Sequence, residues 1–321
     1  MTGKGRLILI DGMCGAGKST AAQKLSRQFE SLSLPHRWMH EEIDGHPIRE
    51  GEFEAGDLTT LDGMALNIED MNKRWQHLVD TVNHFGGTYI LEGCFIHAID
   101  RYFYKSAYSA QQTLDYFDRV SNVLAQSDTL FVYLRTPDAR ATLANVFPIR
   151  GQWWKDLILS PEERFFDITE HKGEETAYAC CDLFHAISDE VFDRYPGDKL
   201  LIHASNGSWP GYPRKIMRHL GLPYVDIPRV SLEAPESYCG VYSAVINGAE
   251  EKIEVKYDPM NDTLYTVGFW PYMKLVPITA NTFEYESFPT TLHFSAADGR
   301  RTITGTGEYG MNVEGNTYTM I

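Results

Sequence analysis

Short hydrophobic runs alternate with longer amphipathic stretches between Arg6 and Val225. A helix is expected over Lys18–Ser31, directly after the first apolar run. Alternation of this kind predicts an α/β fold with a doubly wound parallel sheet, helices on both faces, and functional residues at the carboxyl ends of the strands. The predicted strands are Leu7–Ile10, Arg37–His40, Thr88–Leu91, Thr129–Leu134 and Lys199–His203.

The pattern changes around residues 228–235. Beyond this point, short runs of β type are separated by turn sequences such as Asn-Gly, Asp-Pro and Asp-Gly. The chain is therefore predicted to have two domains, an α/β domain over 1–230 and an antiparallel β-domain over 235–321. The strands predicted for the second domain are 238–245, 252–257, 263–269, 273–278, 282–287, 291–294, 302–306 and 317–320.

The first strand is followed by GMCGAGKST, Gly12 to Thr20, which has the spacing G-x-x-x-x-G-K-S. In a strand–loop–helix context this motif cradles phosphate with backbone N–H groups. Lys18 would reach the β- and γ-phosphates of ATP, and Ser19 would bind Mg²⁺. A glycine turn that binds nothing is disfavoured, because strand, loop and helix follow in the required order. The predicted nucleotide-binding residues are Gly12, Gly15, Ala16, Gly17, Lys18, Ser19 and Thr20.

Candidate acids follow the second and third strands. The stretch HEEIDGHP places Glu41, Glu42 and Asp44 near the phosphate loop. Glu41, the first acid beyond the strand, is favoured as the group that positions an acceptor hydroxyl and takes its proton, with Glu42 and Asp44 as alternatives. His46 is expected to order the loop. Glu92, at the end of ILE, is the expected Mg²⁺ partner, with helix capping as the alternative.

A basic and aromatic segment, Val146–Asp156, has the composition of a mobile lid. Cations that close over a transferring phosphoryl group neutralise its charge and exclude water. Arg150 and Lys155 are the candidate cations of this segment. Ordinary helix packing is the alternative explanation for its two tryptophans.

Composition narrows the ligands and the compartment. The chain of 321 residues is 43% hydrophobic and carries a formal net charge of −15. The part from Ser231 onward holds 12 acidic and 5 basic residues, a net −7. We expect no nucleic-acid or anionic-membrane partner, because both need a basic face. Five scattered cysteines, together with no signal peptide or long apolar run, favour a cytoplasmic protein with a small-molecule ligand and possible homodimerisation.

The combination of ILIDGMCGAGKST, HEE, ILEG and DTLFVYLRTPDAR resembles the deoxynucleoside and thymidylate kinase group of P-loop kinases, over roughly residues 5–225. The resemblance implies that Glu41 acts on the acceptor hydroxyl and that Arg150 is a lid arginine, with Arg135 and Arg140 less favoured. It also implies that Asn206 and Gly207 line the adenine. In the group an arginine follows the strand-three acid, whereas Gly93 stands here. The C-terminal part resembles small lipocalin-like β-domains.

Two functions follow from these features. The first is an ATP- and Mg²⁺-dependent phosphotransferase that moves the γ-phosphate to a hydroxyl of a small molecule, either nucleoside-like or antibiotic-like. The second is a nucleotide-dependent switch or binding module whose β-domain recruits a partner. The acceptor-side acid and the arginine of the basic segment favour the first.

Overall fold

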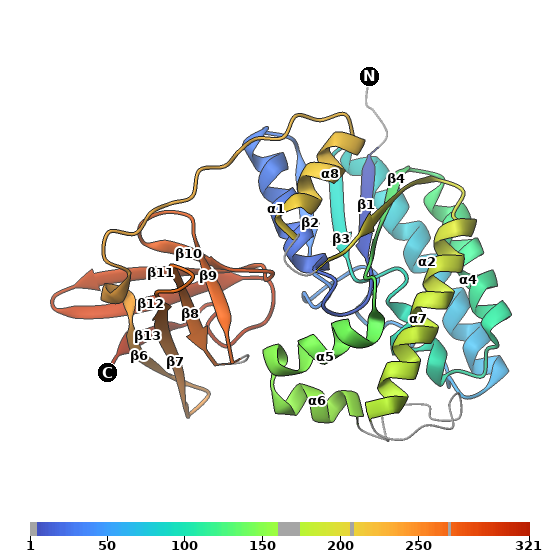
Figure 1. Cartoon of the computed structure of the whole chain (residues 1–321). Helices are drawn as coiled ribbons and strands as arrows, with labels where there is room; N and C mark the ends of the chain where they lie inside the picture. Colours follow the sequence, from blue (N-terminus) through green and yellow to red (C-terminus); the bar gives the residue numbers. More distant parts are fainter. Residues whose placement is uncertain (1–4, 160–173, 206–208, 269–270) are drawn as a thin grey trace. The chain divides into compact units, whose positions relative to one another are not determined.

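The computed structural model describes residues 5–159, 174–205, 209–268 and 271–321. The chain divides into two compact units (Figure 1). Unit 1 comprises residues 1–147 and 152–225, and unit 2 comprises residues 148–151 and 226–321.

Unit 1 is built on a five-stranded parallel sheet of order β2-β3-β1-β4-β5, which confirms the predicted P-loop α/β fold. The strands read as continuous apolar runs because both faces of the sheet are covered. The second strand begins and ends one residue earlier than predicted, since Met39 is the last residue that pairs with β3. The strands are β1 (Arg6–Asp11), β2 (His36–Met39), β3 (Thr88–Glu92), β4 (Asp128–Arg135) and β5 (Asp198–His203).

Helices lie on both faces of this sheet. In Figure 1, α1 (Lys18–Ser31) and α8 (Tyr212–His219) cover one face, and α2 (Leu61–Phe85), α4 (Ala110–Leu124) and α7 (Glu174–Arg194) cover the other. Helix α1 has the bounds predicted from the sequence. The shorter helical elements are α3 (Ala98–Arg101), η1 (Phe103–Lys105) and η4 (Trp209–Gly211).

The basic and aromatic segment, Val146–Asp156, spans the end of α5 (Ala139–Arg150) and most of α6 (Gln152–Leu159). Trp154 is buried and lies with its ring 5.8 Å from that of Phe147, whereas Trp153 is 47% exposed. Lys155 forms an ion pair with Glu174 at 2.5 Å. Helix packing therefore accounts for Trp154, and the mobility of the segment stays a prediction.

Unit 2 is a closed barrel of eight antiparallel strands. Each strand pairs with its neighbours in the chain, and β13 closes the ring against β6. Asn247-Gly248 and Asp298-Gly299 turn between neighbouring strands with positive φ angles of 50° and 84°, and of 52° and 76°. The strands confirm the predicted β-domain: β6 (Gly240–Ile246), β7 (Ala249–Asp258), β8 (Thr263–Val267), β9 (Met273–Pro277), β10 (Thr282–Tyr285), β11 (Thr290–Ala297), β12 (Arg300–Gly307) and β13 (Thr317–Met320). A short helix, η5 (Pro235–Tyr238), precedes the first strand.

Side chains fill the barrel interior. Tyr242, Phe283, Leu292 and Ile303 have no exposed surface and belong to one apolar cluster. A recess lies beside Arg229 and is lined in part by Leu232, Leu264 and Leu275. Within the part of the chain that the structure describes, no helix is both long and apolar enough to cross a membrane.

Candidate functional site

The phosphate loop lies between β1 and α1, as its sequence predicts. Gly12, Gly15, Ala16 and Gly17 form the turn, and Lys18, Ser19 and Thr20 begin the helix. Gly17 has a φ of 90°, and a Cβ there would meet the Trp209 ring at 2.8 Å, so a larger residue would be strained and crowded. The first N–H groups of an α-helix have no intrahelical acceptors, so a helix that begins directly after a glycine turn is an arrangement that binds anions.

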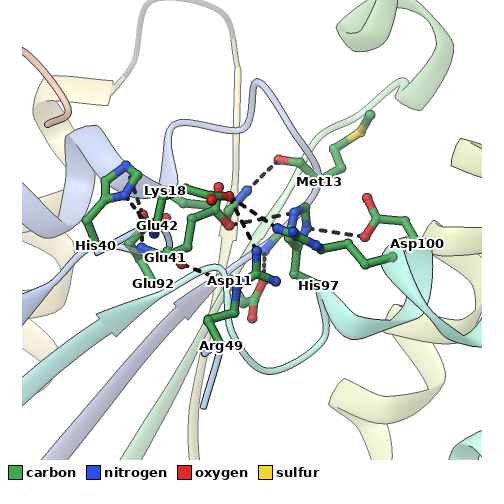
Figure 2. Close-up of polar contacts among 12 residues, drawn as sticks. Asp11, Met13, Lys18, His40, Glu41, Glu42, Arg49, Glu92, His97 and Asp100 are labelled. Atoms are coloured by element: carbon green, nitrogen blue, oxygen red, sulfur yellow. Dashed lines mark hydrogen bonds and ion pairs between the residues drawn. The ribbon is translucent and has the colours of Figure 1, made fainter. Parts of the chain in front are cut away.

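Acidic and basic side chains from four segments meet beside this loop (Figure 2). Lys18 is buried, and its Nζ donates to the carbonyl oxygen of Met13 at 3.5 Å. Glu41 and Lys18 both pack against Gly93, the residue just after β3. A Cβ at this position would overlap the Glu41 carboxylate and lie 3.1 Å from Cε of Lys18. Glu41 and Lys18 therefore share the space that Gly93 leaves open.

Glu41 and Glu92 are directly linked. The backbone N–H of Glu41 donates to Oε1 of Glu92 at 3.2 Å, and Nε2 of His40 lies 3.5 Å from the same oxygen. Glu92 has no exposed surface. The carboxyl ends of β2 and β3 thus bring together the two acids that the sequence singles out for different tasks.

The two acids differ in their protonation. Burial opposes ionisation of Glu41, but His97, Lys18 and Arg49 together lower its pKa well below the ordinary value. Burial and the nearby charge of Glu41 raise the pKa of Glu92 to about 8. Burial also disfavours the charged form of Lys18, yet Glu41 and Glu92 raise its pKa above the ordinary value. At neutral pH the free site therefore holds an ionised Glu41 beside a charged Lys18, and burial opposes the ionisation of Glu92 next to them.

The loop after β2 is anchored by His46 and Arg49. Nδ1 of His46 accepts from the backbone N–H groups of Ile48 and Arg49, each at 3.1 Å. Burial, followed by the charge of Arg49, lowers the pKa of His46 to about 3, so that this ring is neutral. His46 therefore orders the loop, as expected.

The buried guanidinium of Arg49 holds three glutamates of this loop. Its Nε donates to the carbonyl oxygen of Glu41 at 3.3 Å, and its two Nη atoms lie 3.1 Å from Glu52 and 3.4 Å from Glu42. Arg101 of α3 contacts Glu42 at 3.2 Å. Glu42 is therefore engaged by two arginines, whereas the Glu41 carboxylate lies next to Lys18.

The site residues also fit a Mg²⁺ ion. The Ser19 side chain hydrogen-bonds Glu92, and Oε2 of Glu92 is a buried oxygen with no hydrogen-bond partner among the described residues. Within those residues, no group of three or more His, Cys, Asp or Glu side chains could hold a metal ion alone. Mg²⁺ in phosphoryl-transfer sites usually takes one or two protein oxygens and completes its shell with water and phosphate. Ser19 and Glu92 match that pattern.

Sequence reasoning missed Asp11 and His97. Asp11 ends β1 and accepts from the backbone N–H groups of Gly12 at 2.9 Å and Phe95 at 2.7 Å, which ties the phosphate loop to the loop after β3. Burial raises the pKa of Asp11 to about 6. His97 lies 3.6 Å from Glu41. An acid at the end of an apolar strand could have identified Asp11, whereas His97 carries no motif.

The structure places two candidate lid arginines, Arg135 and Arg140, in ion pairs and does not describe the predicted adenine-binding residues. Arg135 is held by both carboxylate oxygens of Asp189 at 2.7 and 2.8 Å, and Arg140 is paired with Glu175 and Asp182. Arg150 is the last residue of α5 and falls in the short stretch grouped with unit 2, so its role stays a prediction. Asn206 and Gly207 lie outside the described residues.

Comparisons with known proteins found similar solved structures. No protein-family model and no curated protein matches the chain. YorR from Bacillus subtilis, in complex with phosphorylated GDP, is 16% identical, with a TM-score of 0.38 over 67% of this chain and 95% of its own. The Mycobacterium tuberculosis APS kinase CysC, with AMPPNP and APS, is 14% identical, with a TM-score of 0.39 over 68% and 99%. Thymidylate kinase from Candida albicans is 17% identical, with a TM-score of 0.38 over 68% and 92%.

Proposed function

We propose that the protein is an ATP-dependent phosphotransferase that moves the γ-phosphate to a hydroxyl group of a small molecule, nucleoside-like or antibiotic-like. The observation that carries this proposal is the convergence of an ionised Glu41 and a charged Lys18 at Gly93, next to the Ser19–Glu92 pair. A site that only binds nucleotide needs the loop and the metal partner. It does not need a second, ionised acid beside the lysine.

The residues divide the work as follows. The N–H groups of the phosphate loop and Lys18 hold the β- and γ-phosphates and stabilise negative charge in the transition state. The oxygen of the acceptor hydroxyl forms a bond to the γ-phosphorus, and the Glu41 carboxylate accepts the proton that this hydroxyl releases. The bond from the γ-phosphorus to the bridging oxygen breaks, and ADP leaves with that electron pair. A bound Mg²⁺, held by Ser19 and Glu92, would neutralise charge on the phosphate oxygens.

The surroundings of Glu41 support its role over those of the other two acids. Glu42 is half exposed and engaged by Arg49 and Arg101. Asp44 is exposed to solvent, whereas Glu41 is largely buried beside Lys18. Glu41 is held by its backbone from two sides, through Glu92 and Arg49, which leaves its carboxylate to work on a substrate.

The test begins with ATP binding by calorimetry. It continues with ³¹P NMR of ATP consumption against a library of hydroxyl compounds, with mass spectrometry of the product. We expect a phosphorylated acceptor and a loss of turnover by about 10³-fold or more in Lys18→Ala. Lys24→Ala, a change on the same helix outside the loop, is the matched control and should keep wild-type turnover. Near-normal turnover in Lys18→Ala, or no ATP binding by the wild type, would overturn the proposal.

A further inference from the structure

The His97 ring lies between two carboxylates. Its Nε2 is 3.6 Å from Oε2 of Glu41, and its Nδ1 is 3.4 Å from Oδ1 of Asp100 (Figure 2). The His97 side chain is only 10% exposed. Each of its two nitrogens therefore faces a negative oxygen at ion-pair distance in a place that water reaches poorly.

This geometry favours the imidazolium form. A neutral ring carries a lone pair on one nitrogen, and either tautomer would point that lone pair at a carboxylate oxygen. A doubly protonated ring places a positive charge between two negative ones, and its contacts with Glu41 and Asp100 are ion pairs rather than conventional hydrogen bonds. Asp100 and His97 lie three residues apart at the start of α3, so a single helical turn fixes the distance between them.

We propose that His97, oriented by Asp100, is a positioning residue that holds the Glu41 carboxylate in place beside Lys18. The inference rests on the proposed function, because it assigns Glu41 the acceptor side of that reaction. His97 does not touch the reacting atoms and acts through Glu41 alone.

The other charged groups around Glu41 do not replace His97. Lys18 occupies the phosphate side, and Arg49 is bonded to the backbone oxygen of Glu41 rather than to its carboxylate. His40 lies against Glu92. Within the described residues, His97 is the group that lies at ion-pair distance from Oε2 of Glu41. That oxygen has no conventional hydrogen bond from any described residue, so the ion pair fixes its direction.

The first experiment uses the free protein and needs no acceptor. Ring ¹⁵N NMR at pH 7 would identify His97 by the signal that is missing in His97→Gln. We expect two protonated nitrogens on His97 in the wild type and a clear change of that signal in Glu41→Gln and Asp100→Asn. The exposed His84, in the last turn of α2, should be unchanged. A neutral His97 ring, or a signal that ignores Glu41→Gln, would overturn the proposal.

The second experiment measures turnover with Mg·ATP and water as the probe acceptor, together with ATP affinity by calorimetry. His97→Gln should lower turnover by about tenfold or more with unchanged ATP affinity, and His97→Lys, which keeps a cation, should recover most of that loss. His84→Gln is the control for histidine removal. Equal losses in His97→Gln and His97→Lys would contradict the proposal. Absence of ATP binding in the wild type would contradict the proposed function instead. The ¹⁵N spectrum of the His97 ring would still show whether His97 is paired with Glu41 and Asp100.

Discussion

The two units bury different kinds of side chain in their centres. At the carboxyl edge of the parallel sheet, unit 1 buries Asp11, Lys18 and Glu92 within one cluster. Unit 2 fills its barrel with Tyr242, Phe283 and other apolar residues. Among the described residues, all buried side-chain polar atoms that lack a hydrogen-bond partner lie between 38 and 195, and none lies in the barrel.

The apolar residues in the barrel of unit 2 stabilise its fold, whereas the buried charged residues of unit 1 are suited to binding and chemistry. Buried charge without full pairing destabilises a fold and is kept where a ligand completes it. The polar groups inside the barrel are paired instead, as Thr266 is with the Tyr285 hydroxyl at 3.1 Å. We infer that the chemistry lies in unit 1 and that the barrel core serves as a scaffold.

The strongest test of this difference is Glu41→Gln. The change keeps shape and hydrogen bonding but removes the carboxylate, so phosphoryl transfer should fall by about 10²- to 10⁴-fold while ATP affinity stays nearly constant. Calorimetry and single-turnover transfer would measure the two effects. Glu42→Gln is the matched control and should retain transfer. Wild-type transfer in Glu41→Gln would pass the acceptor role to Glu42 or Asp44.

Phe283→Ala tests the barrel side of the comparison. Phe283 has no exposed surface and packs edge-on against Tyr238 and Phe294, so its loss should destabilise unit 2 by about 3–5 kcal/mol. Urea unfolding would show this as an earlier barrel transition, with ATP affinity unchanged. A fragment of residues 1–230 should bind ATP as well. Joint loss of barrel stability and ATP binding would show that the two units depend on one core.

The free protein should become less stable as pH rises from about 5 to 8. The pKa values of Asp11, Glu52 and Glu92 are raised by burial to about 6, 8 and 8, so the folded state retains protons that the unfolded chain releases. Stability is therefore lost as pH rises toward each of these folded-state pKa values, by several kcal/mol in total, whereas His46, whose pKa burial lowers to about 3, offsets part of this loss below about pH 6.5. Urea unfolding at pH 5.5, 7 and 8.5 measures how steeply the free energy of unfolding falls with pH. Glu52→Gln should flatten this dependence, and a rising or flat wild-type profile would contradict the assignment.

The smallest expected effect comes from alanine substitution at two glycines with nearly the same backbone φ angle. Gly93 and Gly86 have φ angles of 64° and 68°, so alanine at either costs about 1 kcal/mol in unfolding free energy. A Cβ at Gly86 meets nothing within 4 Å, whereas at Gly93 it displaces the Glu41 carboxylate. Both variants should lose the stability that the left-handed backbone costs, Gly93→Ala should lose more because its Cβ crowds a buried carboxylate, and only Gly93→Ala should lose turnover. Equal turnover in the two would show that the position of Glu41 does not matter.

Local patterns predicted much of this architecture from the sequence. The phosphate loop follows from the spacing of Gly12, Gly17 and Lys18, and the barrel strands follow from short runs of β type between turn sequences. These features depend on residues that are close in the chain. Their physical causes, backbone freedom at glycine and alternation of side chains along a strand, act over a few residues.

Glu41 and Glu92 were identified because parallel strands end at the same edge of a sheet. That rule places two acids near a phosphate loop but does not say which one is ionised. The choice depends on burial and on the cations that surround each carboxylate. Those surroundings come from elements far apart in the sequence.

The sequence by itself determined the fold class, the phosphate loop and the candidate acids at the strand ends, because each depends on residues that are close in the chain. Only the tertiary structure decided that Gly93 makes room for Glu41, that Arg49 and Arg101 engage Glu42, and that His97 stands between Glu41 and Asp100. Electrostatic interactions in a buried site depend on distances through space and on exclusion of water. Neither quantity exists until the chain has folded.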